Sequence, residues 1–561
     1  MAEYLNFLKS NCKNCYKCIR HCPVKSIRFS GNQAHIVAEE CVLCGNCYVV
    51  CPQNAKEIAD GTELARVLLD ADAPVIASLA PSFVAYFDGC GFSAMEEALR
   101  AIGFAGVQET AIGATLVKRE YEKQLRAQEQ DVILSSCCHA VNLLVRKYYP
   151  DLAELLSPVV SPMVAHGMEI KRQQPQAKVV FIGPCIAKKA EAEESGVIDA
   201  VLTFDELAQM LQEAGVKPQK QMDEDEHSRA RLFPTAGGIL RTMPERPDTY
   251  TYLVVDGTEN CIAVLEDLNT GNVHHCFIEM SACPGSCIGG PVMAKKKKAP
   301  VRSFRAVDGF AGKEDFPVES PEDGALHAQF SYLGVVRPMP SEREIAEVLG
   351  KMGKTKPEDE LNCGSCGYNT CREKAIAVCQ GKADVSMCLP YLMDRTERFS
   401  NNILNNSPIG VLVLNEEYEV QQINRAAMKM LRIGSELDVL GEQVVRVMDP
   451  MPFIDVLENG KIVRERLEYY AEYKKYIELT VVHDKNTHIL IALLRDVTEA
   501  ETQRHRKEEL ERHTVEIADK VVEKQMRIVQ EIASLLGETT AETKIALTKL
   551  KESIVREEEN E

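Results

Sequence analysis

The chain has 561 residues, of which 45% are hydrophobic, and a formal net charge of −19 at pH 7. This acidity argues against nucleic acid as the main partner, because phosphate binding needs clustered Lys and Arg. No apolar run approaches the ~18 residues of a membrane span, and the first residues lack the pattern of a signal peptide. We therefore expect a cytoplasmic protein of several domains that does not use a membrane.

The sequence contains 21 cysteines, and two runs at residues 12–23 and 41–52 repeat the spacing C-x2-C-x2-C-x3-C-P. This spacing is typical of bacterial ferredoxins, in which the fourth cysteine of each run serves the other cluster. Residues 1–60 are therefore predicted to be a 2[4Fe-4S] ferredoxin domain, with a pair of zinc sites as the alternative. The predicted ligand sets are Cys12, Cys15, Cys18 and Cys51 for one cluster, and Cys41, Cys44, Cys47 and Cys22 for the other.

Short apolar segments alternate with helical patterns between residues 73 and 336, which predicts an α/β domain. Strands are expected over 73–80, 131–136, 178–183 and 250–255, and helices over 94–104 and 205–215. Cysteines follow three strand-like runs, so we expect one central site in a crevice at strand ends. The one basic run, Lys295–Lys298, is interpreted as a solvated loop, with a docking patch as the alternative.

Three cysteine-bearing segments carry a family resemblance: SSCCHAV at 135–141, GPCIAKKAE at 183–191 and EMSACPGSCIGG at 279–290. They resemble the motifs TSCCPxW, MPCxxKxxE and ExMxCxxGCxxGG of the [FeFe]-hydrogenase catalytic domain. The resemblance implies that residues 61–338 form this α/β domain and bind an H-cluster. In that family the H-cluster is a [4Fe-4S] cubane joined through one cysteine to a diiron unit that carries CO, cyanide and azadithiolate. The implied cubane ligands are Cys138, Cys185, Cys283 and Cys287, and Cys287 also bridges to the diiron unit.

The resemblance further implies which side chains surround the diiron unit and deliver protons. The implied contacts are Lys188 and Ser82 as cyanide partners, and Pro81 and Phe233 as apolar wall positions. Cys137 is implied as the relay cysteine, with Glu120 and Ser157 as the next stations outward. A packing thiol is the alternative for Cys137.

Six positions depart from the family pattern around the intact ligands. Gly183 and Ser281 stand where the family carries methionines against the diiron unit, and we expect these changes to open space and alter the apolar wall. The other departures are His139 for Pro, Val141 for Trp, Met163 for Gln, and Lys123 for the outer acid of the proton route. Intact ligands in altered surroundings indicate binding with low turnover.

A third cysteine group has the spacing C-x2-C-x4-C-x16-C, at Cys363, Cys366, Cys371 and Cys388. We predict a 4Fe-4S domain over residues 339–397, with a helix at 372–378 leading toward the fourth cysteine and zinc as the alternative metal. Cys379 lies outside the spacing and is expected to be a spare buried thiol.

Residues 398–498 resemble a PAS sensory domain of the α+β class. The segments SPIGV, INRAA and RDVTE carry the resemblance, together with β-runs at 410–414 and 418–423 and a later hairpin that turns near 484–486. The ligand of this domain is unknown. His483 and His488 lie in the predicted hairpin turn and are expected at the surface rather than as haem ligands.

Residues 499–561 are charged and helical, with an apolar heptad at Val515, Val522, Val529 and Leu536. Gly537 is expected to end this helix, and a capping box of Thr539 and Glu542 to open a second. A helical pair or coiled coil of this kind buries its seam against another chain, so we expect a homodimer or docking onto an effector.

The domain order resembles the sensory [FeFe]-hydrogenases of anaerobic bacteria. It implies a hydrogen or redox sensor of low turnover, with three [4Fe-4S] clusters plus the H-cluster and with H2 and protons as reactants. A ferredoxin-like electron partner and a downstream kinase or phosphatase are the implied protein partners. One alternative is a metabolic, ferredoxin-linked hydrogenase with a regulatory PAS domain, and another is an iron–sulfur interaction protein that never receives the diiron unit.

Overall fold

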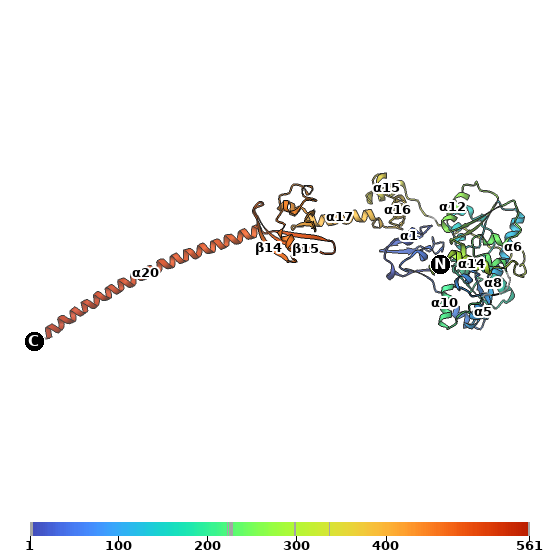
Figure 1. The fold of residues 1–561 in the computed structure, drawn as a ribbon, viewed down its shortest axis with the longest axis horizontal. Coiled ribbons are helices and arrows are strands. Elements are labelled where there is room, and N and C mark those ends of the chain that lie inside the picture. The colour runs from blue at the N-terminus through green and yellow to red at the C-terminus, as the bar shows by residue number, and fades with distance from the viewer. Residues whose placement is uncertain (1–3, 222, 224–227, 297–298, 336, 559–561) are drawn as a thin grey trace. The chain divides into compact units, whose positions relative to one another are not determined.

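The structure is a computed structural model that describes residues 4–221, 223, 228–296, 299–335 and 337–558 (Figure 1). The chain forms two compact units, Met1–Leu392 and Met393–Glu561. Among the described residues, no helix combines the length and apolar character needed to cross a membrane.

The N-terminal segment consists of two small antiparallel strand pairs and two short helices, each helix starting inside a cysteine run. The pairs are β1 (Leu5–Phe7) with β4 (Lys56–Ile58) and β2 (Ile27–Ser30) with β3 (Gln33–Ile36), and the helices are α1 (Lys17–Arg20) and α2 (Asn46–Val50). The residue before each helix, Tyr16 or Gly45, has a left-handed backbone. This turn lets the chain curl around a compact group and then enter the helix that carries the third cysteine of the run.

The α/β part contains two parallel sheets. One has the order β6-β5-β8-β9 and the other the order β10-β11-β7. The strands are β5 (Val75–Leu79), β6 (Gly106–Glu109), β7 (Val132–Leu134), β8 (Lys178–Gly183), β9 (Ala200–Thr203), β10 (Thr251–Asp256) and β11 (Cys276–Ser281). All residues of β5, β7 and β9 are buried, as expected for parallel strands covered on both faces. The four predicted strands are confirmed, but they belong to two sheets.

Helices surround these sheets, and the two predicted ones are confirmed as α5 (Phe92–Ala101) and α10 (Phe204–Glu213). The others are α3 (Thr62–Leu69), α4 (Phe83–Tyr86), α6 (Ala111–Ala127), α7 (His139–Tyr148), α8 (Pro162–Gln173), α9 (Ala187–Ser195), α11 (Gly238–Thr242), α12 (Thr258–Leu268), α13 (Pro291–Lys296) and α14 (Pro300–Phe310).

Three further helices flank the third cysteine group: α15 (Glu342–Lys351), α16 (Cys371–Cys379) and α17 (Leu389–Asn406). The predicted helix at 372–378 is therefore confirmed, and Thr370 caps it by accepting a hydrogen bond from the backbone N–H of Glu373. The expectation that Cys379 is buried is wrong. Its thiol is exposed, because α16 buries the face formed by Lys374, Ala375 and Ala377.

The second unit holds a five-stranded antiparallel sheet of order β13-β12-β16-β15-β14. Its elements are β12 (Gly410–Asn415), β13 (Val420–Ile423), α18 (Arg425–Met430), α19 (Met451–Leu457), β14 (Val463–Tyr470), β15 (Lys475–Asp484) and β16 (Ile489–Asp496). The predicted β-runs and hairpin are thus present. His488 is exposed as expected, whereas His483 belongs to β15 and is half-buried. One ring nitrogen of each histidine lies near the Glu416 carboxylate.

The C-terminal segment forms one helix, α20 (Thr498–Glu558), so the predicted stop at Gly537 is wrong (Figure 1). Gly537 keeps a helical backbone, and Thr539 does not cap a new helix. Its hydroxyl donates to the carbonyl of Leu535 one turn earlier, at 2.5 Å. An interior glycine costs a helix only about 1 kcal/mol, which is too little to end it without a left-handed turn.

Candidate active site and metal centres

A cavity of about 100 Å³ lies where β7, β8 and β11 end, and Cys138, Cys185 and Cys287 line it. Cys138 follows β7, Cys185 follows β8, and Cys283 follows β11. Because β8 belongs to one sheet and β7 and β11 to the other, the predicted central site draws its thiols from both sheets. The structure therefore brings together the three cysteine segments that the sequence places far apart.

The loop after β11 is shaped by glycines. Gly285 has a left-handed φ of +79°, and its N–H donates to the Asp256 carboxylate. A Cβ on Gly289 would overlap the carbonyl oxygen of Pro284, so only glycine allows the chain to fold back here. This fold-back places Cys287 on the cavity wall.

The thiols of this site are enclosed by protein atoms, although Cys138, Cys185 and Cys283 are only half-buried and Cys287 is exposed. Burial raises the pKa of Cys185 to about 12 and that of Cys287 to about 11, and it raises the pKa of Cys283 well above its ordinary value. Nearby thiolates add to each shift. Thiols in such surroundings become thiolates together only when positive charge compensates them, and iron, when bound, would supply that charge.

Two polar side chains on the cavity wall fit a bound non-protein group. The Ser82 hydroxyl is buried and has no hydrogen-bond partner among the described residues. The buried Lys188 ammonium donates to the carbonyl oxygen of Cys137 at 3.1 Å and pairs with the Glu191 carboxylate. Burial lowers the pKa of Lys188, but Glu191 and the sulfur of Cys185 outweigh burial and raise it. An unpartnered hydroxyl and a lysine held in its charged form suit an anionic ligand such as cyanide.

The expected wall residues Pro81 and Phe233 line the cavity, as do Met163 and Ser281. The expectation that Gly183 opens space is wrong. A Cβ at Gly183 would lie 2.7 Å from ring carbons of Phe181. Phe181 stands two residues earlier on the same face of β8 and itself lines the cavity, so its ring fills the space above the glycine.

The predicted proton stations are not joined to one another. Cys137 Sγ lies 3.1 Å from the hydroxyl of the buried Tyr121, which accepts a hydrogen bond from the Ser136 N–H. Ser157 donates to Gln124 at 2.6 Å, and Glu120 accepts from Lys123 at 2.8 Å. Among the described residues, no hydrogen bond links Glu120 or Ser157 to Cys137.

Sequence reasoning did not identify Tyr121. Tyr121 and Glu120 are neighbours on α6, so their side chains leave the helix about 100° apart and only one can face Cys137. No motif in the sequence shows which of the two does so.

Two of the departures lie away from this cavity. His139 lines a separate cavity with Lys147 and Glu194, and its Nε2 atom is 3.7 Å from the Glu194 carboxylate. Burial lowers the pKa of His139. Val141 is fully buried in the core. These two changes therefore alter the packing of α7 rather than the cavity wall.

The ferredoxin-like cysteines gather in the predicted crossed sets. One set lines a small cavity: Cys12, Cys15, Cys18 and Cys51. In the other set, burial raises the pKa of Cys44 to about 12, with Cys22 and Cys41 adding to the shift. Gly45, the neighbour of Cys44, packs against Pro291 at the end of the loop after β11, so the second set is the one beside this loop. Among the described residues, no three His, Cys, Asp or Glu side chains converge to hold one metal ion.

The ferredoxin-like segment directly contacts the end of the loop after β11, which carries Cys287. A Cβ on Gly45 would overlap the Pro291 ring. Lys295 donates to the carbonyls of Tyr48 at 3.1 Å and Cys51 at 2.9 Å. The solvated-loop interpretation is therefore wrong for Lys295, while Lys297 and Lys298 lie outside the described residues.

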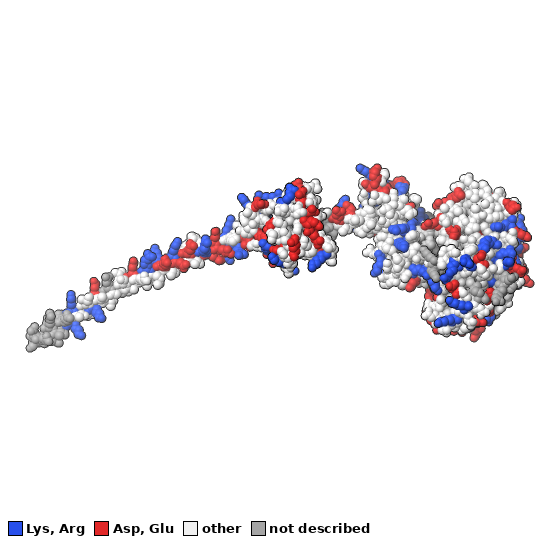
Figure 2. All heavy atoms as spheres, in the orientation of Figure 1, with Lys and Arg blue, Asp and Glu red and all other residues white. Residues whose placement is uncertain are grey.

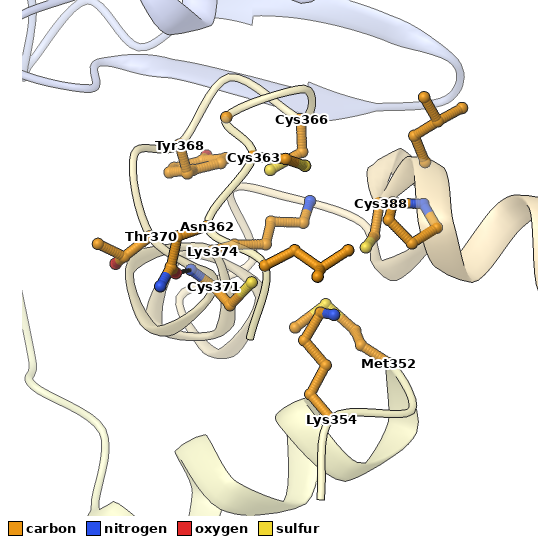
Figure 3. Close-up of a pocket in the computed structure, with 14 residues that line it drawn as sticks. Met352, Lys354, Asn362, Cys363, Cys366, Tyr368, Thr370, Cys371, Lys374 and Cys388 are labelled. Carbon is orange, nitrogen blue, oxygen red and sulfur yellow. Dashed lines mark hydrogen bonds between the residues drawn. The ribbon is translucent and has the colours of Figure 1, made fainter. Parts of the chain in front are cut away.

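The third cysteine group also surrounds a space. Its lining includes Cys363, Cys366, Cys371 and Cys388, and Figure 3 shows these side chains around the Lys374 side chain. Lys374 is 1% exposed, and burial lowers its pKa to about 8 against the opposing effects of Cys366 and Asp384. The four thiols fit a small iron–sulfur cluster with a cation built into the site.

Comparisons with known proteins agree with this geometry. Residues 73–291 match the family model "Iron only hydrogenase large subunit, C-terminal domain", residues 5–52 match "4Fe-4S dicluster domain", and residues 359–390 match an Fe-S cluster model. The chain is 28% identical over 368 residues to the periplasmic [Fe] hydrogenase large subunit of Nitratidesulfovibrio vulgaris, covering 52% of this chain and 87% of that protein.

Two further relatives match over similar stretches. The NADP-reducing hydrogenase subunit HndD of Solidesulfovibrio fructosivorans is 28% identical over 323 residues, covering 45% of this chain and 55% of that protein. The nuclear prelamin A recognition factor of Xenopus laevis is 22% identical over 388 residues, covering 54% and 83%. Similarity to this chain thus extends to a protein that is not named as a hydrogenase.

Proposed function

We propose that this chain, in which residues 73–291 form a domain of the iron-only hydrogenase large-subunit family, binds an H-cluster and catalyses slow, reversible oxidation of H2 to protons and electrons. The observation that carries the proposal is the buried, unpartnered Ser82 hydroxyl, which shares a cavity with Lys188 and Cys287. A site that held only a cubane would not need these donors.

Four thiolates would hold the cubane: Cys138, Cys185, Cys283 and Cys287, the last also attaching the diiron unit. That unit, when bound, supplies the iron centre at which H2 reacts. Lys188 and Ser82 would donate hydrogen bonds to its cyanides, and Pro81 and Phe233 would exclude water from it.

The low turnover in this proposal follows from the side chains along the expected proton route. Glu120 and Asp323 hold the pKa of Lys123 above its ordinary value, so its ammonium stays charged beside the Glu120 carboxylate. A lysine that stays charged cannot accept a proton from Glu120, so Lys123 cannot serve as the outer acid of the expected route. Cys137 meets Tyr121 in place of Glu120, so proton exchange along the expected route is slow.

We further propose that the protein is a cytoplasmic hydrogen or redox sensor. The strand order of the second unit, β13-β12-β16-β15-β14, supports a PAS domain over 398–498. Along α20, Val515, Val522, Val529 and Leu536 are each more than half exposed in the single chain. Figure 2 shows acidic and basic side chains mixed along this helix. Such a helix suits a homodimer or a signalling kinase or phosphatase as its partner.

Infrared spectroscopy after co-expression with hydrogenase maturation enzymes tests the catalytic proposal. We expect bands of metal-bound CO and cyanide, together with weak H2 production from reduced viologen. Absence of the bands would show that the chain is an iron–sulfur protein without the diiron unit. Rapid H2 production would favour the metabolic alternative over the sensor.

Crosslinking of the matured protein with and without H2 tests the sensor proposal. A sensor must populate two arrangements of the second unit that depend on redox state. We expect a different crosslink pattern along α20 under H2, and identical patterns would contradict the proposal.

A further inference from the structure

The domain that contains the third cysteine group packs directly on the dicluster domain, and both lie in the first unit. The Lys25 ammonium donates to the carbonyl of Gly367 at 3.2 Å and to that of Ile19 at 3.3 Å. A Cβ on Gly367 would lie 3.1 Å from the Ile19 side chain. The loop that carries Cys366 therefore contacts the helix that carries Cys18.

A second contact continues this surface. The Phe29 N–H donates to the carbonyl of Lys382 at 2.7 Å, and the Lys382 ammonium donates to the carbonyl of Lys25 at 3.1 Å while pairing with Glu40. These hydrogen bonds to backbone carbonyls and the ion pair between Lys382 and Glu40 fix how the two domains pack on each other. The contact is therefore a specific interface.

An aromatic ring with two lysines lies at the centre of this interface. Tyr368 is 3% exposed, and its hydroxyl has no hydrogen-bond partner among the described residues. Lys25 Nζ lies 5.9 Å from the centre of its ring and Lys374 Nζ lies 5.5 Å from it. Lys25 belongs to the dicluster domain and Lys374 to the C-terminal cluster site. The ring thus contacts a cation from each domain.

Lys374 points into the third cysteine group (Figure 3). Its ammonium donates to the carbonyl of Asp384 at 2.6 Å and contacts the Met387 sulfur at 3.1 Å. Lys374 lines the same small cavity as Cys366 and Cys388. A buried cation beside a cluster stabilises the state that carries one more electron, because it offsets the added negative charge.

We propose that Lys374 is a positioning residue that raises the reduction potential of the cluster held by the third cysteine group, called the C-terminal cluster below. The contact of the Tyr368 ring with Lys25 and Lys374 couples this cluster to the dicluster domain of the same chain. The C-terminal [4Fe-4S] cluster gains one electron as a dicluster-domain cluster loses one. No separate carrier is needed. The proposal rests on the proposed iron–sulfur loading of both domains, but not on the diiron unit.

The test uses the full chain expressed without maturation enzymes, with its iron–sulfur clusters reconstituted and titrated with dithionite under electron paramagnetic resonance. The Lys374→Met change removes the charge but keeps the length of the side chain. We expect half-reduction of the C-terminal cluster to require a ratio of reduced to oxidised reference couple that is about tenfold higher, which is a shift of about 59 mV for one electron. The exposed Lys351, which pairs with Glu347 in the same domain, provides the matched control, and Lys351→Met should leave the potential unchanged.

A second variant covers the case in which Lys374→Met fails to hold its cluster. Lys25→Met lies in the other domain, and we expect it to weaken the magnetic coupling between the reduced C-terminal cluster and the dicluster domain. An unchanged potential in Lys374→Met would overturn the proposal. If that variant loses its cluster, unchanged coupling in Lys25→Met would overturn it instead. Because no diiron unit is present, failure here is distinct from failure of the hydrogenase proposal.

Discussion

The cavity at the strand ends and the C-terminal site of residues 363–388 both place cysteines beside a lysine with little exposure, but they are built in different ways. The cavity takes its thiols from the ends of strands in two sheets, so residues 138 and 287 meet only after the whole domain folds. The C-terminal site takes its thiols from residues 363–388. Lys188 donates to the carbonyl of Cys137 and pairs with the Glu191 carboxylate, whereas Lys374 donates to the carbonyl of Asp384 and contacts the Met387 sulfur.

This difference shows where each site tolerates change. The sheets hold the cavity cysteines in place, so a substitution at a wall position such as Ser281 leaves the ligands where they are. The C-terminal site is not held by a sheet, so its geometry depends on the spacing of its four cysteines.

Removing one cysteine from each site separates the two functions. Cys287→Ser should abolish the infrared bands of CO and cyanide and all H2 turnover, because this thiolate is the proposed attachment of the diiron unit. Cys388→Ser is the matched change in the other site. It should remove one [4Fe-4S] cluster by iron analysis and leave the infrared bands in place. Loss of the bands in both variants would mean that the two sites do not load independently.

Removing the charge of Lys188 should weaken the binding of the cyanide ligands in the cavity and leave the cubane in place. For Lys188→Met we expect turnover to fall by a factor on the order of 100, since a lost charge-assisted hydrogen bond and an unpaired Glu191 each cost about 1–3 kcal/mol. The cyanide bands should also shift. The exposed Lys217 is a suitable control, and turnover equal to that of Lys217→Met would exclude Lys188 as a partner of the bound group.

A side chain at Gly183 should destabilise the cavity wall. In Gly183→Ala the new Cβ lies 2.7 Å from the Phe181 ring, and such overpacking costs about 1–3 kcal/mol. Thermal unfolding followed by circular dichroism measures the loss. Gly309 in α14 has no atom within 4 Å of its virtual Cβ, so Gly309→Ala should not lower stability. An equally stable Gly183→Ala variant would show that the Phe181 ring is free to move.

The smallest effect concerns α20, a long helix whose apolar side chains are exposed in the single chain. If this helix is continuous, Gly537→Ala should stabilise it by about 0.5–1 kcal/mol, seen as slower amide hydrogen exchange around residue 537. Ala533→Gly in the same helix should have the opposite effect. Faster exchange in Gly537→Ala would mean that the glycine takes a left-handed turn and ends the helix as the sequence suggested.

The local features of this molecule could be predicted from the sequence, and the long-range ones could not. The crossed cysteine sets and the helix after Cys371 follow from spacing over a few residues. The split of the strands between two sheets depends on which strands pair, and both β7 (VIL) and β8 (KVVFIG) are short, mostly buried apolar runs that do not show which sheet they join. Phe181 filling the space at Gly183, and Tyr121 facing Cys137 in place of Glu120, depend on side-chain directions that no motif records.

The contact between Gly45 and Pro291, with Lys295 held by the carbonyls of Tyr48 and Cys51, has a consequence for how the protein is assembled. The loop that bears Cys287 packs against the dicluster loop, so a misfolded N-terminal segment would remove one of the surfaces that position this loop. Folding of the first 60 residues and closure of the cavity built by residues 138–287 are therefore coupled.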